Sequence, residues 1–142
     1  MENETPHFGL EKRRPHRLLL LHWHGFVPSQ VYRDGLLEAV QETRQGSFTN
    51  WVMDMKAMKV IRQADQDWTL NDWFARFKLL GIQRLGLVVS DDIFNQMAVS
   101  SMIAIIRPKT TTEIEYFQEL SEAIHWAQEG DHNISDLGLF SV

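Results

Sequence analysis

Residues 50–81 decide the fold, and they read NWVMDMKAMKVIRQADQDWTLNDWFARFKLLG. The short apolar run 51–53 ends at Asp54, which is typical of a buried strand that leads into a polar loop. Thr69, with Asp72 three residues later, is a typical helix start, and the apolar residues that follow have helical spacing. One face of this helix gathers large side chains: Leu70, Trp73, Phe74, Phe77 and Leu80. The stretch therefore predicts a strand, a long loop and a helix.

The loop between this strand and this helix is where we expect a function. It covers 56–68 and is longer than most connections in compact α/β units. Loops that follow parallel strands lie at the carboxyl edge of the sheet, where open α/β sheets usually place their binding sites. The predicted interaction residues are Asp54, Lys56, Asp67, Trp68 and Thr69.

Strands and helices alternate on both sides of this stretch. The predicted strands are 8–11, 17–24, 51–54, 84–89 and 112–117, and the predicted helices begin near Pro28 and Thr69 and cover 91–106 and 119–129. The order β-β-α-β-α-β-α-β-α predicts a single α/β domain over 1–142, in which a mostly parallel sheet has an antiparallel edge from its first two strands. The leucine run 18–21 indicates a central strand that is buried on both faces. Residues 1–7 are expected to be a flexible start and 131–142 a tail.

Composition narrows the class of protein. A chain of 142 residues with 44% hydrophobic and 23% charged residues is typical of one globular domain. A net charge of −5 argues against nucleic acid or an anionic membrane as the main partner. The absence of cysteine excludes disulfides and thiolate metal sites, and it fits a reducing compartment. The apolar run LLLLHW is too short to span a bilayer, so we expect a cytoplasmic protein without a membrane span.

Two apolar sets are candidates for a ligand pocket or an interface. Trp73 and Phe77 either line a pocket for an apolar ligand or simply form core. In the helix predicted over 91–106, the expected core stripe consists of Phe94, Met97, Ala98, Met102 and Ile105. Val99, Ile103 and Ile106 lie off that stripe, and they suit a homodimer contact, a pocket wall or a docking site for the tail. The tail offers apolar residues of its own: Ile134, Leu137, Leu139 and Phe140.

Polar residues give little support for a metal or for catalysis. His22 and His24 share one face of a strand, and Asp54 ends a neighbouring strand, but the sequence fixes no further ligand. The aspartates near the central helix match no calcium-binding loop, and the serines lie in no nucleophile motif. We therefore expect no metal, no cofactor and no enzymatic activity.

Four segments carry a resemblance to a known family. They are LHWHG before Pro28, WVMDMKAM, the Trp68 and Trp73 pair in DWTLNDWF, and YFQELSEAIHW. Together they resemble the anti-sigma-factor-antagonist (STAS) domain, and more closely the small stand-alone STAS-like bacterial proteins that are sometimes grouped with CRAL-TRIO lipid carriers. The resemblance implies a small regulatory or binding domain rather than an enzyme. True antagonists carry a phosphorylatable serine in an Asp-Ser-Ser-Gly-like motif; here Asp67-Trp68-Thr69 is the nearest equivalent, which argues against a phosphorylation switch.

Two functions follow as hypotheses. The first is a non-enzymatic regulatory or protein-interaction domain that binds an unknown protein partner through the loop 56–68. The alternative is a carrier or sensor of a small apolar or lipid-like ligand, held between the helix of Trp73 and Phe77 and the helix of Val99, Ile103 and Ile106. A metal-dependent enzyme that uses His22, His24 and Asp54 is a third and weaker hypothesis.

Overall fold

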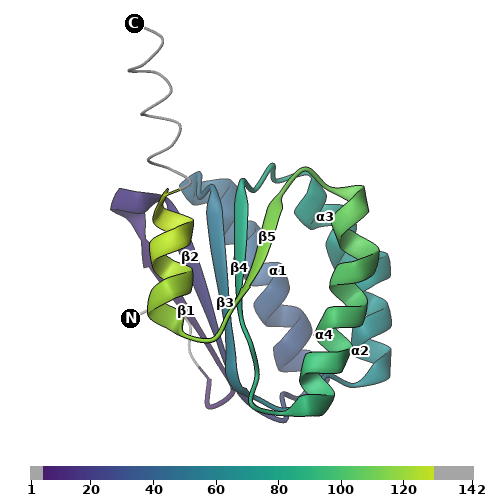
Figure 1. Cartoon of the computed structure of the whole chain (residues 1–142). Coiled ribbons are helices and arrows are strands. Elements are labelled where there is room, and N and C mark those ends of the chain that lie inside the picture. The colour runs from purple at the N-terminus through teal and green to yellow at the C-terminus, as the bar shows by residue number, and fades with distance from the viewer. Residues whose placement is uncertain (1–4, 130–142) are drawn as a thin grey trace, which may run out of the picture.

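A computed structural model of the chain describes residues 5–129 and shows an α/β fold built on one five-stranded sheet (Figure 1). The strands lie in sequence order: β1 (Phe8–Arg13), β2 (Leu18–Gly25), β3 (Asn50–Met58), β4 (Arg84–Val88) and β5 (Glu113–Phe117). β1 pairs antiparallel with β2, and the other neighbouring pairs are parallel. The predicted fold class is confirmed. The predicted tail contacts and the first four residues lie outside the described residues.

Helices make the crossovers between the parallel strands. They are α1 (Ser29–Gly46), a continuous run of α2 (Gln63–Trp68), a π-helical turn (Thr69–Trp73) and α3 (Phe74–Lys78), and then α4 (Ile93–Ile106). A last helix over 120–129 follows β5. Short 3₁₀ turns cover Arg14–His16 and Arg107–Lys109. Within the described residues, no helix is long and apolar enough to cross a membrane.

The two faces of the sheet are covered unequally. Parallel strands that advance in one direction through right-handed crossovers place α1, α2–α3 and α4 on the same face. The last helix covers the other face, where Ala123 and Ala127 pack on Leu18, Leu20 and Val52. Figure 1 shows it on the opposite side of the sheet from α1–α4. Since neighbouring side chains of a strand point to opposite faces, each leucine of the run 18–21 is 0% exposed, which confirms the predicted central strand.

The prediction of a long loop before the central helix was wrong. β3 continues to Met58 and α2 begins at Gln63, so only 59–62 connect them. Thr69 therefore lies in the middle of a helix and not at its start, and it is 5% exposed. The hydroxyl of Thr69 donates to the carbonyl oxygen of Asp65 (2.7 Å), which is how threonine satisfies its polar group inside a helix. The same residue type and spacing imitate a helix start in the sequence.

The predicted phase of α4 was also wrong. Phe94, Met97 and Ile105 were expected in the core, but they are 66%, 61% and 46% exposed. The residues that face the sheet are Ala98, Val99, Met102, Ile103 and Ile106. The apolar pattern alone cannot set the phase because α4 contains no charged residue and its apolar residues are spread around the helix.

Candidate functional site

An apolar cavity of about 50 Å³ lies between the sheet and the helices α1, α2–α3 and α4. The five apolar residues singled out in the sequence all line it: Trp73, Phe77, Val99, Ile103 and Ile106. Strand residues close its floor, among them the methionines Met53, Met55 and Met58, while Met102 of α4 closes its side. The structure thus brings together two sets of residues that the sequence could only consider separately.

Aromatic rings form the wall of this cavity on the α3 side. The ring centroid of Trp73 lies 4.8 Å from that of Phe77 and 6.0 Å from that of Trp51. The indole nitrogen of Trp51 donates to the hydroxyl of Thr43 (2.9 Å), whereas the buried indole nitrogen of Trp73 has no hydrogen-bond partner among the described residues. The volume is well below the roughly 150 Å³ that holds benzene and the roughly 300 Å³ at which drug-sized pockets begin. In this conformation the cavity holds nothing larger than a very small molecule.

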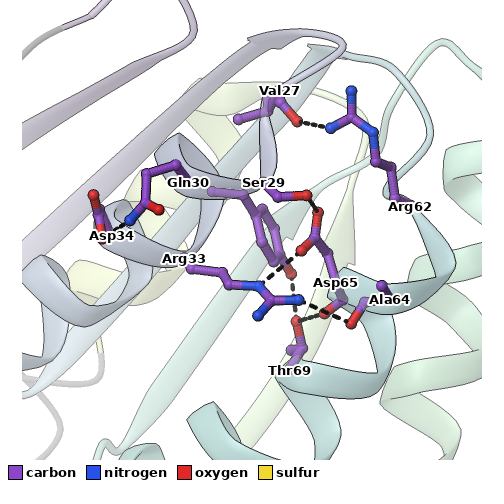
Figure 2. A network of polar contacts seen from close by, with 10 residues as sticks. Val27, Ser29, Gln30, Arg33, Asp34, Arg62, Ala64, Asp65 and Thr69 are labelled. Atoms are coloured by element: carbon purple, nitrogen blue, oxygen red, sulfur yellow. Dashed lines mark hydrogen bonds and ion pairs between the residues drawn. The ribbon is translucent and has the colours of Figure 1, made fainter.

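A buried carboxylate joins α1 to α2 beside this cavity (Figure 2). Asp65 is 1% exposed, and its two oxygens accept hydrogen bonds from Ser29 Oγ (2.7 Å) and Arg33 Nε (2.9 Å). Arg33 also donates to the carbonyl oxygen of Ala64 (3.3 Å). A buried charge is tolerated when it is paired and hydrogen-bonded, so this group fixes α2 against the first turn of α1.

The predicted interaction residue Thr69 belongs to the same network and lies in the interior. Its single hydroxyl proton goes to Asp65, so Tyr32 donates its own proton to Thr69 Oγ1 (2.7 Å). Burial raises the pKa of Tyr32 and keeps the phenol neutral. A hydroxyl held on both sides and shielded from water is not presented to a partner in this conformation.

The other predicted interaction residues lie in three separate places. Asp67 is exposed and accepts a hydrogen bond from Gln63 (3.0 Å), and the neighbouring Trp68 is half-buried with the guanidinium of Arg33 5.4 Å above its ring. Lys56 lies at the end of β3, where its ammonium pairs with Asp91 (3.4 Å). Asp54 points to the other face of the sheet and contacts His22. The five residues therefore do not form one site.

His22 lies between two carboxylates on the sheet face that carries the last helix. Its ring nitrogens are 3.0 Å from Asp54 and 3.1 Å from Glu11. The hydrogen bond with Asp54, opposed by partial burial and reinforced by Glu11, raises the pKa of His22. Burial alone would raise the pKa of Asp54, but hydrogen bonds from His22 and from the backbone of Lys56 outweigh it and lower that pKa. Across residues 5–129, no three histidine, aspartate or glutamate side chains come together as a metal site.

The outer side of α4 is the feature that sequence reasoning missed. Ile93, Phe94, Met97 and Ile105 are between 46% and 66% exposed and lie on one side of this helix. We call these four residues the α4 surface. Tyr116 of the edge strand β5 is 42% exposed and lies on another side of α4, near Gln96 and Ser100. The signal in the sequence was the absence of any charged residue in IFNQMAVSSMIAII, since a helix that is apolar all round is normally buried.

A second cavity lies under the first turns of α4. Its volume is about 220 Å³, and Ser90, Asn95, Gln96, Ser100 and Tyr116 are among the residues that line it. Asn95 is 0% exposed, and neither polar atom of its side chain has a hydrogen-bond partner among the described residues. Ser90, by contrast, donates to the carbonyl oxygen of Met58 (2.6 Å) and accepts from the backbone of Asp92 (2.9 Å).

Comparisons with known proteins bear on the fold. No protein-family model matches the chain, and no curated protein does. The chain is similar to the crystal structure of an uncharacterised DUF3478-family protein with a SpoIIAA-like fold from Shewanella loihica PV-4. The TM-score is 0.54 at 12% identity, and the match covers 89% of this chain and 98% of the other. This likeness confirms the STAS-like fold that the sequence predicted: the chain is an α/β protein with the SpoIIAA-like fold.

Proposed function

We propose that this chain is a non-enzymatic protein-interaction domain of STAS-like fold that binds its partner through the α4 surface. The observation that carries the proposal is a 14-residue helix that has no charged side chain and exposes four large apolar residues to solvent. Burying a large apolar side chain in an interface contributes about 1.5–3 kcal/mol, so even part of this surface supplies a substantial driving force. The lack of cysteine supports a reducing compartment, the cytoplasm, as the place of this interaction.

A comparison within the molecule supports this assignment. α1 covers the same face of the sheet as α4, and its exposed positions are polar: Gln30, Asp34, Gln41, Arg44 and Gln45. Single exposed apolar residues are common on protein surfaces, but a contiguous apolar patch marks an interaction site. Both helices pack on the sheet in the same way, so packing does not explain why their outer sides differ. We attribute the apolar outer side of α4 to binding of a partner.

Photo-crosslinking tests the proposal directly. Benzoyl-phenylalanine replaces Phe94 in the full chain, and this variant is expressed in its native cells. The cells are irradiated, and the crosslinked adducts are identified by mass spectrometry. Phe26 is the matched control, since it is also a phenylalanine and is 61% exposed, against 66% for Phe94. We expect one defined protein adduct at position 94 and none at position 26. Equal labelling at both positions, or no adduct at position 94, contradicts the proposal.

A carrier or sensor of a small apolar ligand is the second candidate function. It is favoured by the apolar cavity that Trp73, Phe77 and Val99 line together with several methionines, whose flexible side chains can enlarge a pocket. This candidate is second because a volume of about 50 Å³ holds only a very small molecule. Native mass spectrometry of gently purified protein tests it: a carrier shows extra mass that disappears on denaturation and is absent from a Val99→Phe variant, in which the cavity is filled.

A further inference from the structure

We infer that the partner of the α4 surface is a second copy of this chain, with the two α4 helices packed antiparallel about a two-fold axis. The inference rests on the proposed function and names its partner. Three properties of the helix support it: the absence of charge along its length, the opposite charges at its two ends, and the unequal sizes of its exposed residues.

Charge is the first property. A two-fold interface brings the same patch of both copies together, so a charged residue near the axis would face the same charge on the second copy. No residue of α4 carries a charge, and therefore this contact buries no like-charged pair. A partner of different sequence would not require this restriction.

The charges that flank the helix select the orientation. Asp91 and Asp92 precede α4, and Arg107 and Lys109 follow it. In an antiparallel pair the acidic end of each helix lies beside the basic end of the other, and the helix dipoles are also opposed. A parallel pair would place acid beside acid and base beside base, which is unfavourable. The side chain of Asp91 is 76% exposed and so is accessible to a second copy.

Side-chain size agrees with this orientation. The large exposed residues Phe94 and Met97 lie in the first half of α4, whereas the exposed residues of the middle and second half are mostly small: Ser100, Ser101 and Ala104. Antiparallel pairing centred near Val99 sets Phe94 across from Ala104 of the second copy and Met97 across from Ser101 of the second copy. In these two pairs a large side chain meets a small one, which allows the helices to approach closely, while Ile93 and Ile105 of the second copy form an apolar contact at each end.

Sedimentation of the purified full chain at micromolar concentrations tests self-association. We expect twice the 16.6 kDa of one chain. Phe94→Glu should weaken the dimer by at least about 30-fold, as loss of a central anchor does, and yield a monomer. Phe26→Glu introduces the same charge at a similarly exposed phenylalanine and should leave the dimer unchanged. Circular dichroism verifies that both variants are folded. If the wild-type chain is a monomer at every concentration from millimolar to micromolar, the inference is overturned.

Engineered cysteines test the orientation, and the chain has no native cysteine to interfere. Ile93→Cys and Ile105→Cys are exposed positions equidistant from Val99. With a short bis-maleimide, each variant alone should give no crosslinked dimer, and the two mixed together should give one. Crosslinking of either variant with itself indicates a parallel pair and overturns the antiparallel arrangement.

The outcomes separate this inference from the proposed function. A monomer in solution, combined with an adduct of another protein at position 94 in cells, rejects the second copy and keeps the interaction domain. If the full chain is a monomer and becomes a dimer when 130–142 are removed, the chain's own tail covers α4. That result rejects both the second copy as partner and the proposed function. A dimer in solution with its own chain as the adduct at position 94 supports both.

Discussion

The side-chain amide of Asn95 lies fully buried in the first turn of α4 without a hydrogen-bond partner among the described residues. An unpaired buried polar group costs about 1–3 kcal/mol. We therefore expect Asn95→Leu, which keeps the side-chain size, to raise the free energy of unfolding by about that amount. Urea denaturation measures the change.

Ser90 provides the control for this variant in the same cavity. Its hydroxyl is hydrogen-bonded on both sides, so Ser90→Ala should lower the free energy of unfolding by about 1–2 kcal/mol. A stability loss in Asn95→Leu similar to that of Ser90→Ala would show that the amide of Asn95 is paired with a molecule bound in the cavity.

His22 gives the fold a dependence on pH. Its pKa is raised in the folded state, so its contribution to stability is fully present below its unfolded pKa of about 6.5 and is lost as pH rises through the raised value. The lowered pKa of Asp54 acts at the other end: its contribution is present above its unfolded pKa of about 3.9 and is lost as pH falls through the folded value. The ion pair therefore contributes most between about pH 4 and pH 6.5.

We expect His22→Gln to lower the free energy of unfolding by roughly 1 kcal/mol more at pH 6 than at pH 8.5. Denaturation curves of both proteins at the two pH values measure the difference. In parallel, NMR titration of the imidazole should show that Asp54→Asn lowers the pKa of His22, because it removes the first cause of the shift. Equal destabilisation at both pH values contradicts the charged pair.

At the scale of the element, the docking of α2 on α1 depends on one carboxylate. Asp65→Ala removes the acceptor of the Ser29 hydroxyl and of Arg33 Nε, so we expect a loss of roughly 2–4 kcal/mol in the free energy of unfolding. Asp67→Ala, two residues further in the same helix, changes an exposed side chain and should stay within about 0.5 kcal/mol. Thermal denaturation compares the two. Equal effects would show that the contact with α1 does not hold α2 in place.

The same elements show where sequence reasoning stops. Element type was predictable, since the strand at 51–53 and the helix through Trp73 and Phe77 carry clear periods. The start of α2 was not predictable, because the hydroxyl of Thr69 bonds to Asp65 inside the helical run and to Tyr32 of α1, a residue distant in sequence. The outward side of α4 was not predictable either, since its apolar residues are spread around the helix and no charged residue identifies the side that faces solvent.

At the scale of the whole molecule, the order of strands and helices was predictable from the alternation of periods, and the leucine run 18–21 correctly indicated a sheet covered on both faces. Of the predicted site residues, the apolar set gathers around one cavity, whereas Asp54 and Thr69 lie on opposite faces of the sheet. Alternation along a strand sets the face of each residue, but only the strand bounds and the crossovers determine which residues from different elements meet there.

The layer made by the last helix gives a test of this arrangement. Ala123 is 0% exposed, and a Cβ built at Gly86 of β4 would lie 3.5 Å from the Cβ of Ala123, so the helix approaches the sheet where both residues are small. We expect Ala123→Leu to overpack this contact and to lower the free energy of unfolding by about 1–3 kcal/mol. Ala75→Leu, at an exposed position of α3, should stay within about 0.5 kcal/mol. Urea denaturation followed by tryptophan fluorescence measures both variants, since Trp126 lies in the affected helix and Trp51 in the sheet. If the two substitutions have the same effect, helix 120–129 does not pack on the sheet, and the second face of the leucine strand is covered by something else.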